Sequence, residues 1–118
     1  MAETLGILLI SAGNERAHYA WVLAAGAAAI GRTVVLFATN EGCRALLERL
    51  DPTPALPGGV ASIATLRAAA IELGVRLLAC DAGLRLAGIE PSALLPQVTV
   101  AGIPSFLSQV SGGQIITL

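Results

Sequence analysis

The chain has 118 residues, the length of one ordinary domain, so we expect a single domain over residues 1–118. Its net charge is −1 and all seven basic residues are arginines, so direct binding to nucleic acid has no electrostatic support. Hydrophobic residues make up 55% and charged residues 13%. The apolar stretch that starts at residue 17 is uncharged only as far as residue 31, however, which is too short for a membrane-spanning helix of about 20 residues.

The first half of the chain predicts two strands and two helices. Residues 4–10 and 33–38 are short apolar runs of the kind found in strands buried on both faces. Between them, residues 15–30 predict an alanine-rich helix that ends at Gly31. Residues 42–50 predict a second helix. One stripe of the first helix is apolar and comprises Ala17, Trp21, Ala24, Ala25 and Ala28.

The second half begins with residues 51–59, whose prolines and glycines predict a loop. We expect this loop to cover the functional edge of the sheet or to lie in a subunit contact. Strands and helical segments then alternate. The strands are predicted at 75–79, 98–101 and 114–118, and the helical segments at 62–73, 82–87, 91–94 and 104–110. Five strands that alternate with helices predict a three-layer α/β/α, Rossmann-like fold with a five-stranded, mainly parallel sheet.

Polar and thiol side chains follow the predicted strands. Ligands of open parallel sheets bind beyond the carboxyl ends of the strands. Ser11 and Asn14 follow the first strand, and Cys43 follows the second. Cys80 and Asp81 follow the third. We therefore expect both cysteines at one edge of the sheet, with the other three residues as candidates to line the same site.

Cys80 lies where a strand runs into a helix. A thiol at the start of a helix faces N–H groups without intrahelical partners and the positive end of the helix dipole, and both stabilise a thiolate. Alternatively, Cys80 is a small buried hydrophobic residue, as a cysteine at the end of an apolar strand often is. The same two interpretations are open for Cys43, as a second functional thiol or as a core side chain.

Metal and cofactor sites have little support in the sequence. His18 is the only histidine, and Cys43 and Cys80 are too far apart in sequence to resemble a zinc site. The turn after the first strand reads SAGNER, not a glycine-rich dinucleotide-binding loop, and without lysine there is no phosphate-loop motif. We expect neither a metal nor an organic cofactor.

Several segments together resemble the DsrE/DsrF-like family. The most specific part is the V-x-L-x-A-C run of residues 75–80, which leads into a short helix and the pair Gly88 and Ile89. The strand at residues 34–37, with its V-x-hydrophobic-F pattern, and the later Gly42 are also similar. The tail adds Val98, Val100, Gly102, Phe106 and Leu107. The similarity spans nearly the whole chain.

The resemblance implies a function in sulfur trafficking. Proteins of this family carry sulfur on the cysteine after the third strand, so Cys80 is implied to hold sulfur as a persulfide or thiosulfonate. The implied role is sulfur relay in sulfur oxidation or tRNA thiolation, with rhodanese-like or TusA-like donor and acceptor proteins. The alternative is a non-catalytic scaffold or small-ligand-binding subunit of a DsrE-like complex, with inert cysteines.

The sequence also predicts where the protein is located and how it assembles. The first residues include Glu3 and no basic segment, so they do not predict a signal peptide. Two cysteines in such a chain are typical of a cytoplasmic protein that keeps its thiols reduced. The low charge and the alanine-rich first helix predict a homo-oligomer, because helices lined with alanine can approach one another closely.

Overall fold

The computed structural model describes residues 3–51 and 55–118. Its centre is a five-stranded sheet in the order β4-β3-β2-β1-β5, in which each neighbouring pair of strands is parallel. The strands are β1 (Leu5–Leu9), β2 (Val34–Ala38), β3 (Arg76–Cys80), β4 (Val98–Ala101) and β5 (Gln114–Thr117). The predicted three-layer α/β fold is confirmed, and the strand order, which the sequence does not determine, places β1 between β2 and β5.

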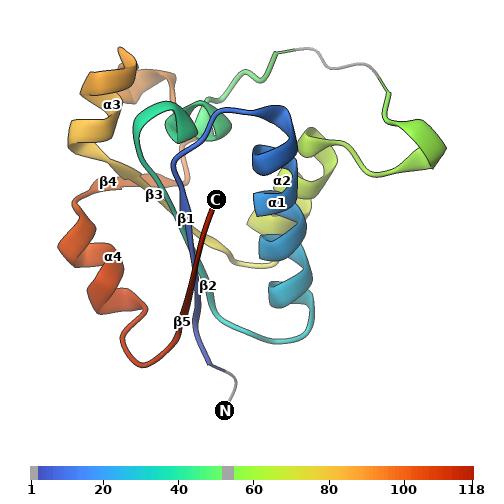
Figure 1. Ribbon diagram of the computed structural model, residues 1–118, viewed down its shortest axis with the longest axis horizontal. Coiled ribbons are helices and arrows are strands. Elements are labelled where there is room, and N and C mark those ends of the chain that lie inside the picture. Colours follow the sequence, from blue (N-terminus) through green and yellow to red (C-terminus); the bar gives the residue numbers. More distant parts are fainter. Residues whose placement is uncertain (1–2, 52–54) are drawn as a thin grey trace.

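Helices lie on both faces of this sheet, as Figure 1 shows. The helices α1 (Asn14–Ala29) and α2 (Ile63–Glu72) cover one face, and α4 (Ile103–Gln109) lies on the other. The short helix α3 (Asp81–Ala87) follows β3 directly at the carboxyl edge. Three 3-10 segments are η1 (Asn40–Leu46), η2 (Pro57–Gly59) and η3 (Pro91–Ala93). None of the helices that the structure describes has the length and apolar composition needed to cross a membrane.

The two faces of the sheet have separate cores of different size. Along β2, Leu36 points into a large core under α1 and α2, whereas Val35 and Phe37 point into a small core under α4. Phe106 of α4 stacks on Phe37, with ring centroids 5.1 Å apart. Because β2 is buried on both faces, its sequence is continuously apolar and does not alternate.

The alanine-rich stripe of α1 packs inside the chain. Its buried residues are Ala17, Ala20, Trp21, Ala24, Ala25 and Ala27. Small side chains let α1 approach the sheet and α2 closely, and the contacts of α1 include both. The stripe is therefore not available for the subunit contact for which we expected it, so the predicted homo-oligomer needs a different surface.

The segment after β2 differs from the expected helix at residues 42–50. The structure has the 3-10 segment η1 instead, which begins earlier and ends at Leu46. The buried guanidinium of Arg67, on α2, donates hydrogen bonds to three backbone carbonyl groups at the end of η1, those of Ala45, Leu47 and Glu48. This long-range anchor binds one carbonyl group within η1 and two just beyond it, and the local pattern gives no sign of it.

The predicted loop at residues 51–59 is described in part, because residues 52–54 lie outside the described residues. Its described part includes η2 and projects beyond α1 and α2, on the opposite side of the molecule from α3 (Figure 1). The described part therefore does not cover the start of α3, where Cys80 lies. A subunit contact through this loop stays a prediction.

Candidate functional site

Cys80 is the last residue of β3 and the N-cap of α3. Its Sγ accepts a hydrogen bond from the backbone N–H of Gly83, with an N to S distance of 3.4 Å. A serine, threonine, aspartate or asparagine oxygen usually takes this capping position. The side chain is half-buried and packs beside the small core, on the α4 side of the sheet. The fold thus holds a partly exposed thiol next to a fixed N–H donor.

Gly83 lets α3 begin in close contact with the segment that follows β2. A Cβ atom at this position would lie 2.5 Å from both the backbone nitrogen of Asn40 and Oγ1 of Thr39. The Thr39 hydroxyl in turn donates a hydrogen bond to Oδ1 of Asn40 at 2.9 Å. The sequence does not predict the contact between these three residues, because it joins distant segments. The only local signal is a glycine in the first turn of a short helix.

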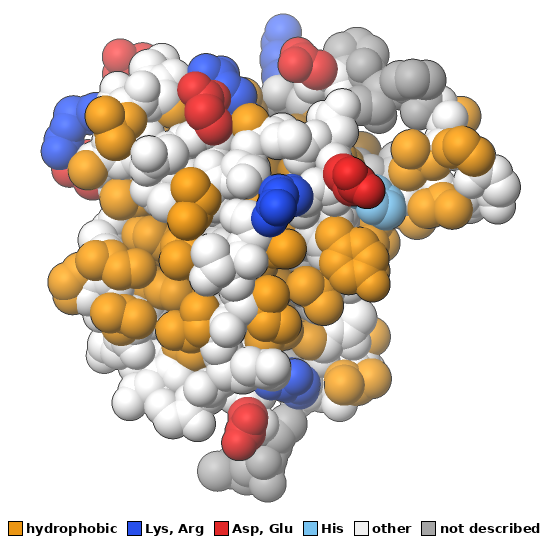
Figure 2. Space-filling model, viewed as in Figure 1, with side chains coloured by type: hydrophobic (Ala, Val, Ile, Leu, Met, Phe, Trp, Pro, Cys, Tyr) orange, Lys and Arg blue, Asp and Glu red, His pale blue; other side chains and the backbone are white. Residues whose placement is uncertain are grey.

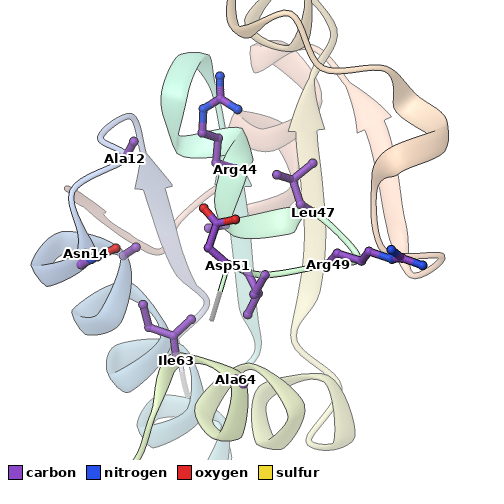
Figure 3. Close-up of a pocket in the computed structure, with 11 residues that line it drawn as sticks. Ala12, Asn14, Arg44, Leu47, Arg49, Asp51, Ile63 and Ala64 are labelled. Carbon is purple, nitrogen blue, oxygen red and sulfur yellow. The ribbon is translucent and has the colours of Figure 1, made fainter. Parts of the chain in front are cut away.

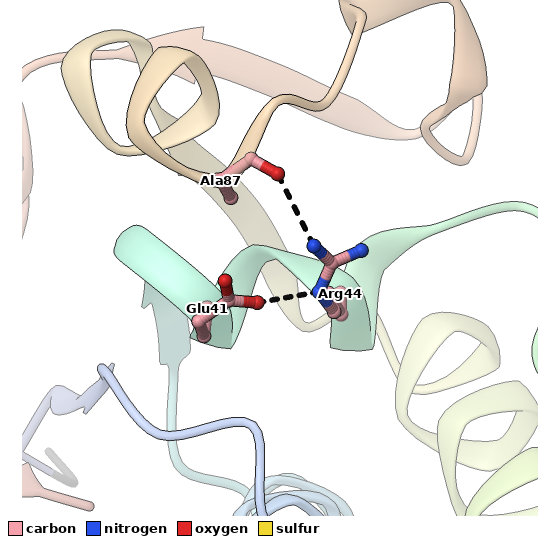
Figure 4. A network of polar contacts seen from close by, with 3 residues as sticks. All are labelled: Glu41, Arg44 and Ala87. Carbon is pink, nitrogen blue, oxygen red and sulfur yellow. Dashed lines mark hydrogen bonds and ion pairs between the residues drawn. The ribbon is translucent and has the colours of Figure 1, made fainter.

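Arg44 connects η1 to the far end of α3. Its guanidinium forms an ion pair with Glu41 and donates a hydrogen bond to the carbonyl oxygen of Ala87 at 3.2 Å (Figure 4). Within α3, Asp81 pairs with Arg85 at 2.7 Å. Exposed ion pairs of this kind contribute about 0–1 kcal/mol each, so they add little to the stability of the fold. The carboxylate of Asp81, a predicted site residue, is engaged by Arg85 beside the thiol.

Cys43 lies at the same edge in a different environment. Its side chain is fully buried in the large core, and its S–H group donates to the carbonyl oxygen of Ala38 at 3.5 Å. Burial raises the pKa of the Cys43 thiol from 9.0 to about 11, and the nearby thiol of Cys80 adds to this rise. At neutral pH Cys43 is therefore a protonated core residue, whereas Cys80 lies beside the opposite core and reaches solvent.

Asn14 and Ser11 take different places. Asn14 opens α1 and lines a pocket between α1, η1 and α2 (Figure 3). The pocket holds about 260 Å³, less than the roughly 300–1,000 Å³ that is usual for small ligands. In Figure 3 the side chains of Arg44 and Arg49 extend away from its centre. Cys80 does not line this pocket, and Ser11 is half-buried in the loop before α1.

A second, mostly apolar pocket of about 640 Å³ lies between α1 and the described part of the 51–59 loop. His18 lines it, and its Nε2 is 2.9 Å from the carbonyl oxygen of Ala61, so this histidine joins α1 to the segment before α2. Within the described ranges, no group of three His, Cys, Asp or Glu side chains is placed to hold a metal ion. Cys80 does not line this pocket either.

Fold and site together define a class of protein. It is a three-layer α/β protein with a parallel sheet, a partly exposed thiol that caps a helix at the carboxyl edge, and a second thiol in the core. Comparison with known proteins identifies the family, because the sequence matches the DsrE/DsrF-like family over residues 5–118. The chain belongs to the DsrE/DsrF-like family, which is associated with sulfur relay. The resemblance found in the sequence is thus confirmed.

Solved structures extend the comparison to the fold. The crystal structure of the ychN protein from E. coli superposes with a TM-score of 0.79 at 16% identity, and the match covers 100% of both chains. MTH1491 from Methanobacterium thermoautotrophicum, titled a protein of unknown function, superposes with a TM-score of 0.71 at 17% identity, over 98% of this chain and 99% of that one. These likenesses show a shared fold. No curated protein sequence matches the chain.

Proposed function

We propose that the chain is a cytoplasmic sulfur carrier in which Cys80 accepts sulfur, holds it as a persulfide or thiosulfonate, and relays it to a partner protein. The observation that carries this proposal is the placement of Cys80. It is a partly exposed thiol at the N-cap of α3, with the N–H of Gly83 directed at its sulfur. Membership of a family associated with sulfur relay supports this kind of function.

The relay by persulfide needs only thiol exchange. The Cys80 thiolate attacks the outer sulfur of a persulfide on the donor, the donor S–S bond breaks, and the donor leaves as a thiolate. Cys80 then carries the outer sulfur, and an acceptor thiolate takes it by the same exchange. No oxidant is consumed in either step. A fixed N–H at the sulfur stabilises negative charge on the thiolate before loading and after release.

The environment of Cys43 supports a single-cysteine relay. A thiol with a pKa of about 11 is almost wholly protonated at neutral pH, and its burial leaves no access for a donor. Donor and acceptor proteins of the rhodanese-like or TusA-like type, in sulfur oxidation or tRNA thiolation, remain the partners that we propose. A homo-oligomer is part of the same proposal.

Release of the stored sulfur tests the relay. The purified chain is incubated with polysulfide, freed of reagent and treated with cyanide, which removes an outer persulfide sulfur as thiocyanate. We expect thiocyanate from the wild type and from Cys43→Ala, and none above background from Cys80→Ser. Release from Cys80→Ser equal to that of the wild type would overturn the proposal. No release from any of the three proteins would favour the scaffold alternative.

A further inference from the structure

Thr39 lies beside Cys80 on the same face of the sheet. The strands β2 and β3 pair in register up to Ala38 and Ala79, so the next position places Thr39 next to Cys80. The backbone of Thr39 is still extended, with φ −139° and ψ 160°. Side chains of an extended strand alternate between faces, and Phe37, two residues earlier, points into the small core under α4. The Thr39 side chain therefore faces the α4 side, as the Cys80 side chain does.

The packing around Gly83 agrees with this placement. A Cβ at Gly83 would lie 2.5 Å from Oγ1 of Thr39 and 2.9 Å from its Cα. The N–H of Gly83 donates to Sγ of Cys80, with an N to S distance of 3.4 Å. Gly83 thus contacts both residues, which brings the hydroxyl group of Thr39 close to the thiol.

Asn40 has an unusual backbone conformation. Its φ is 52°, the only positive φ of a non-glycine residue in the part of the chain that the structure describes. This left-handed conformation is uncommon outside glycine, although asparagine tolerates it better than most residues do. The turn that follows holds it in place, because the N–H of Gly42 donates to the carbonyl oxygens of Thr39 and Ile10 at 3.0 and 2.9 Å. Backbone strain of this kind persists where the surroundings enforce it, and it clusters at functional sites.

Thr39 orients the side chain of Asn40. The Thr39 hydroxyl donates a hydrogen bond to Oδ1 of Asn40 at 2.9 Å, which turns the carboxamide toward Thr39 and hence toward the edge that holds the thiol. Asn40 is exposed, and among the described residues no hydrogen bond uses its amide nitrogen. Both N–H groups of the amide are therefore available to a ligand atom near Cys80.

The charged side chains near the thiol are paired with one another. Glu41 pairs with Arg44 at the start of η1, and Asp81 pairs with Arg85 on α3. Figure 2 shows acidic and basic side chains next to one another over α3, at the upper left of the view. Each carboxylate thus has an arginine that offsets its repulsion of an anion, so an anionic ligand can approach this edge.

The donors beside the thiol distinguish between two kinds of cargo. A hydroxyl or amide N–H group bonds strongly to a charged oxygen and weakly to sulfur. A thiosulfonate on Cys80 ends in sulfonate oxygens, whereas a persulfide ends in one sulfur atom. We propose that the Asn40 amide, oriented by Thr39, binds the sulfonate oxygens of a thiosulfonate on Cys80, which makes Asn40 a specificity-determining residue for this cargo. This inference rests on the proposed function of Cys80.

Tetrathionate loads a thiosulfonate without an added oxidant. The Cys80 thiolate attacks one inner sulfur of tetrathionate, the bond between the two inner sulfur atoms breaks, and thiosulfate leaves with the electron pair. The Cys80 sulfur then carries an –S–SO3⁻ group. Polysulfide loads a persulfide on the same thiol by the same kind of exchange. Both reagents are dianions, so the ratio of their loading rates cancels changes in the reactivity of the thiol and in the overall charge.

Substitutions at Asn40 separate the amide from the backbone. Asn40→Gly removes the N–H donors but keeps the turn, because glycine adopts a positive φ without strain. Asn40→Asp keeps the size of the side chain and has no N–H donor. Gln97→Gly and Gln97→Glu are the matched controls, since Gln97 is an exposed amide in the turn before β4, at the opposite edge of the sheet. Thr39→Val removes the orienting hydroxyl, and Thr39→Ser keeps it.

Intact-mass spectrometry follows both loading reactions, and circular dichroism verifies the fold. We expect the ratio of tetrathionate to polysulfide loading to fall about tenfold in Asn40→Gly and Asn40→Asp, the effect of one lost hydrogen bond to a charged group. The ratio should also fall in Thr39→Val, recover in Thr39→Ser and stay unchanged in both Gln97 variants. An unchanged ratio in folded Asn40→Gly would overturn the proposal, as would an equal fall in the Gln97 variants.

The same data separate this inference from the relay itself. If polysulfide loads the wild type and not Cys80→Ser, but the ratio is the same in the wild type and Asn40→Gly, the relay stands and the role of Asn40 is overturned. If both loading rates fall equally in Asn40→Gly, the residue only holds the site in shape, and the specificity is overturned. A wild type that takes up neither reagent would overturn the relay and this inference with it.

Discussion

The two cysteines lie at the same edge of the sheet, but one is partly exposed and the other is fully buried. Cys80 ends β3 with its thiol on the α4 side and accepts the N–H of Gly83, while Cys43 is enclosed by the large core. From the sequence, both interpretations were open for each residue, because a cysteine after an apolar strand fits either. Burial separates them, and burial depends on contacts between distant segments.

The buried thiol makes stability depend on alkaline pH. The pKa of Cys43 is raised from 9.0 to about 11, mainly by burial. Between these values the unfolded chain releases the thiol proton and the folded chain keeps it, so stability is full below pH 9 and falls as the pH rises toward 11. The loss should reach about 2–3 kcal/mol. Urea unfolding at pH 8 to 11 should show this slope in the wild type and in Cys80→Ser, and a shallower one in Cys43→Ala. Equal slopes in all three would refute the assignment.

Gly83 is the residue on which the start of α3 depends. Gly83→Ala places a Cβ 2.5 Å from backbone and side-chain atoms of Asn40 and Thr39, so the helix must shift away from η1. We expect a loss of about 1–3 kcal/mol in unfolding free energy. Gly26→Ala is the matched control, since a Cβ there meets nothing within 4 Å in the helix α1. It should gain about 0.5–1 kcal/mol. A neutral Gly83→Ala would show that the contact is not tight.

At the scale of elements, local patterns predicted most of the fold. The apolar runs located all five strands, and the junction at Cys80 was visible from the change of pattern between β3 and α3. Two features escaped because they arise between elements. Arg67 of α2 binds carbonyl groups at the end of η1 and just beyond it. The alanine stripe of α1 packs against α2 and the sheet. Strand order likewise depends on contacts that no single segment encodes.

Helix α4 covers its face through one aromatic contact. Phe106 is fully buried and stacks on Phe37 of β2. Phe106→Ala should lower the unfolding free energy by about 3–5 kcal/mol, because the small core then loses its largest side chain on α4. Ser108→Ala, at an exposed position of the same helix, should change it by less than about 0.5 kcal/mol. Urea unfolding compares the two variants. A loss of less than about 1 kcal/mol for Phe106→Ala would mean that other contacts hold α4 on the sheet.

At the scale of the whole molecule, the charged residues are distributed unevenly along the chain. The 13% of charged residues are absent from the last 28 positions, 91–118, which build β4, α4 and β5. Composition alone predicted an association but assigned it to the alanine-rich helix, whose alanine stripe the fold buries. The uncharged positions include the edge strand β5 and the helix α4, which lies on the side of the sheet where Cys80 packs beside the small core.

Intact-mass spectrometry after sulfur loading tests the relay at Cys80 most directly. The wild type, Cys80→Ser and Cys43→Ala are each incubated with a persulfidated donor thiol and measured before and after reductant. The account predicts additions in sulfur-sized steps on the wild type and Cys43→Ala, removed by reductant, and none on Cys80→Ser. Loading of Cys80→Ser as full as that of the wild type would contradict it.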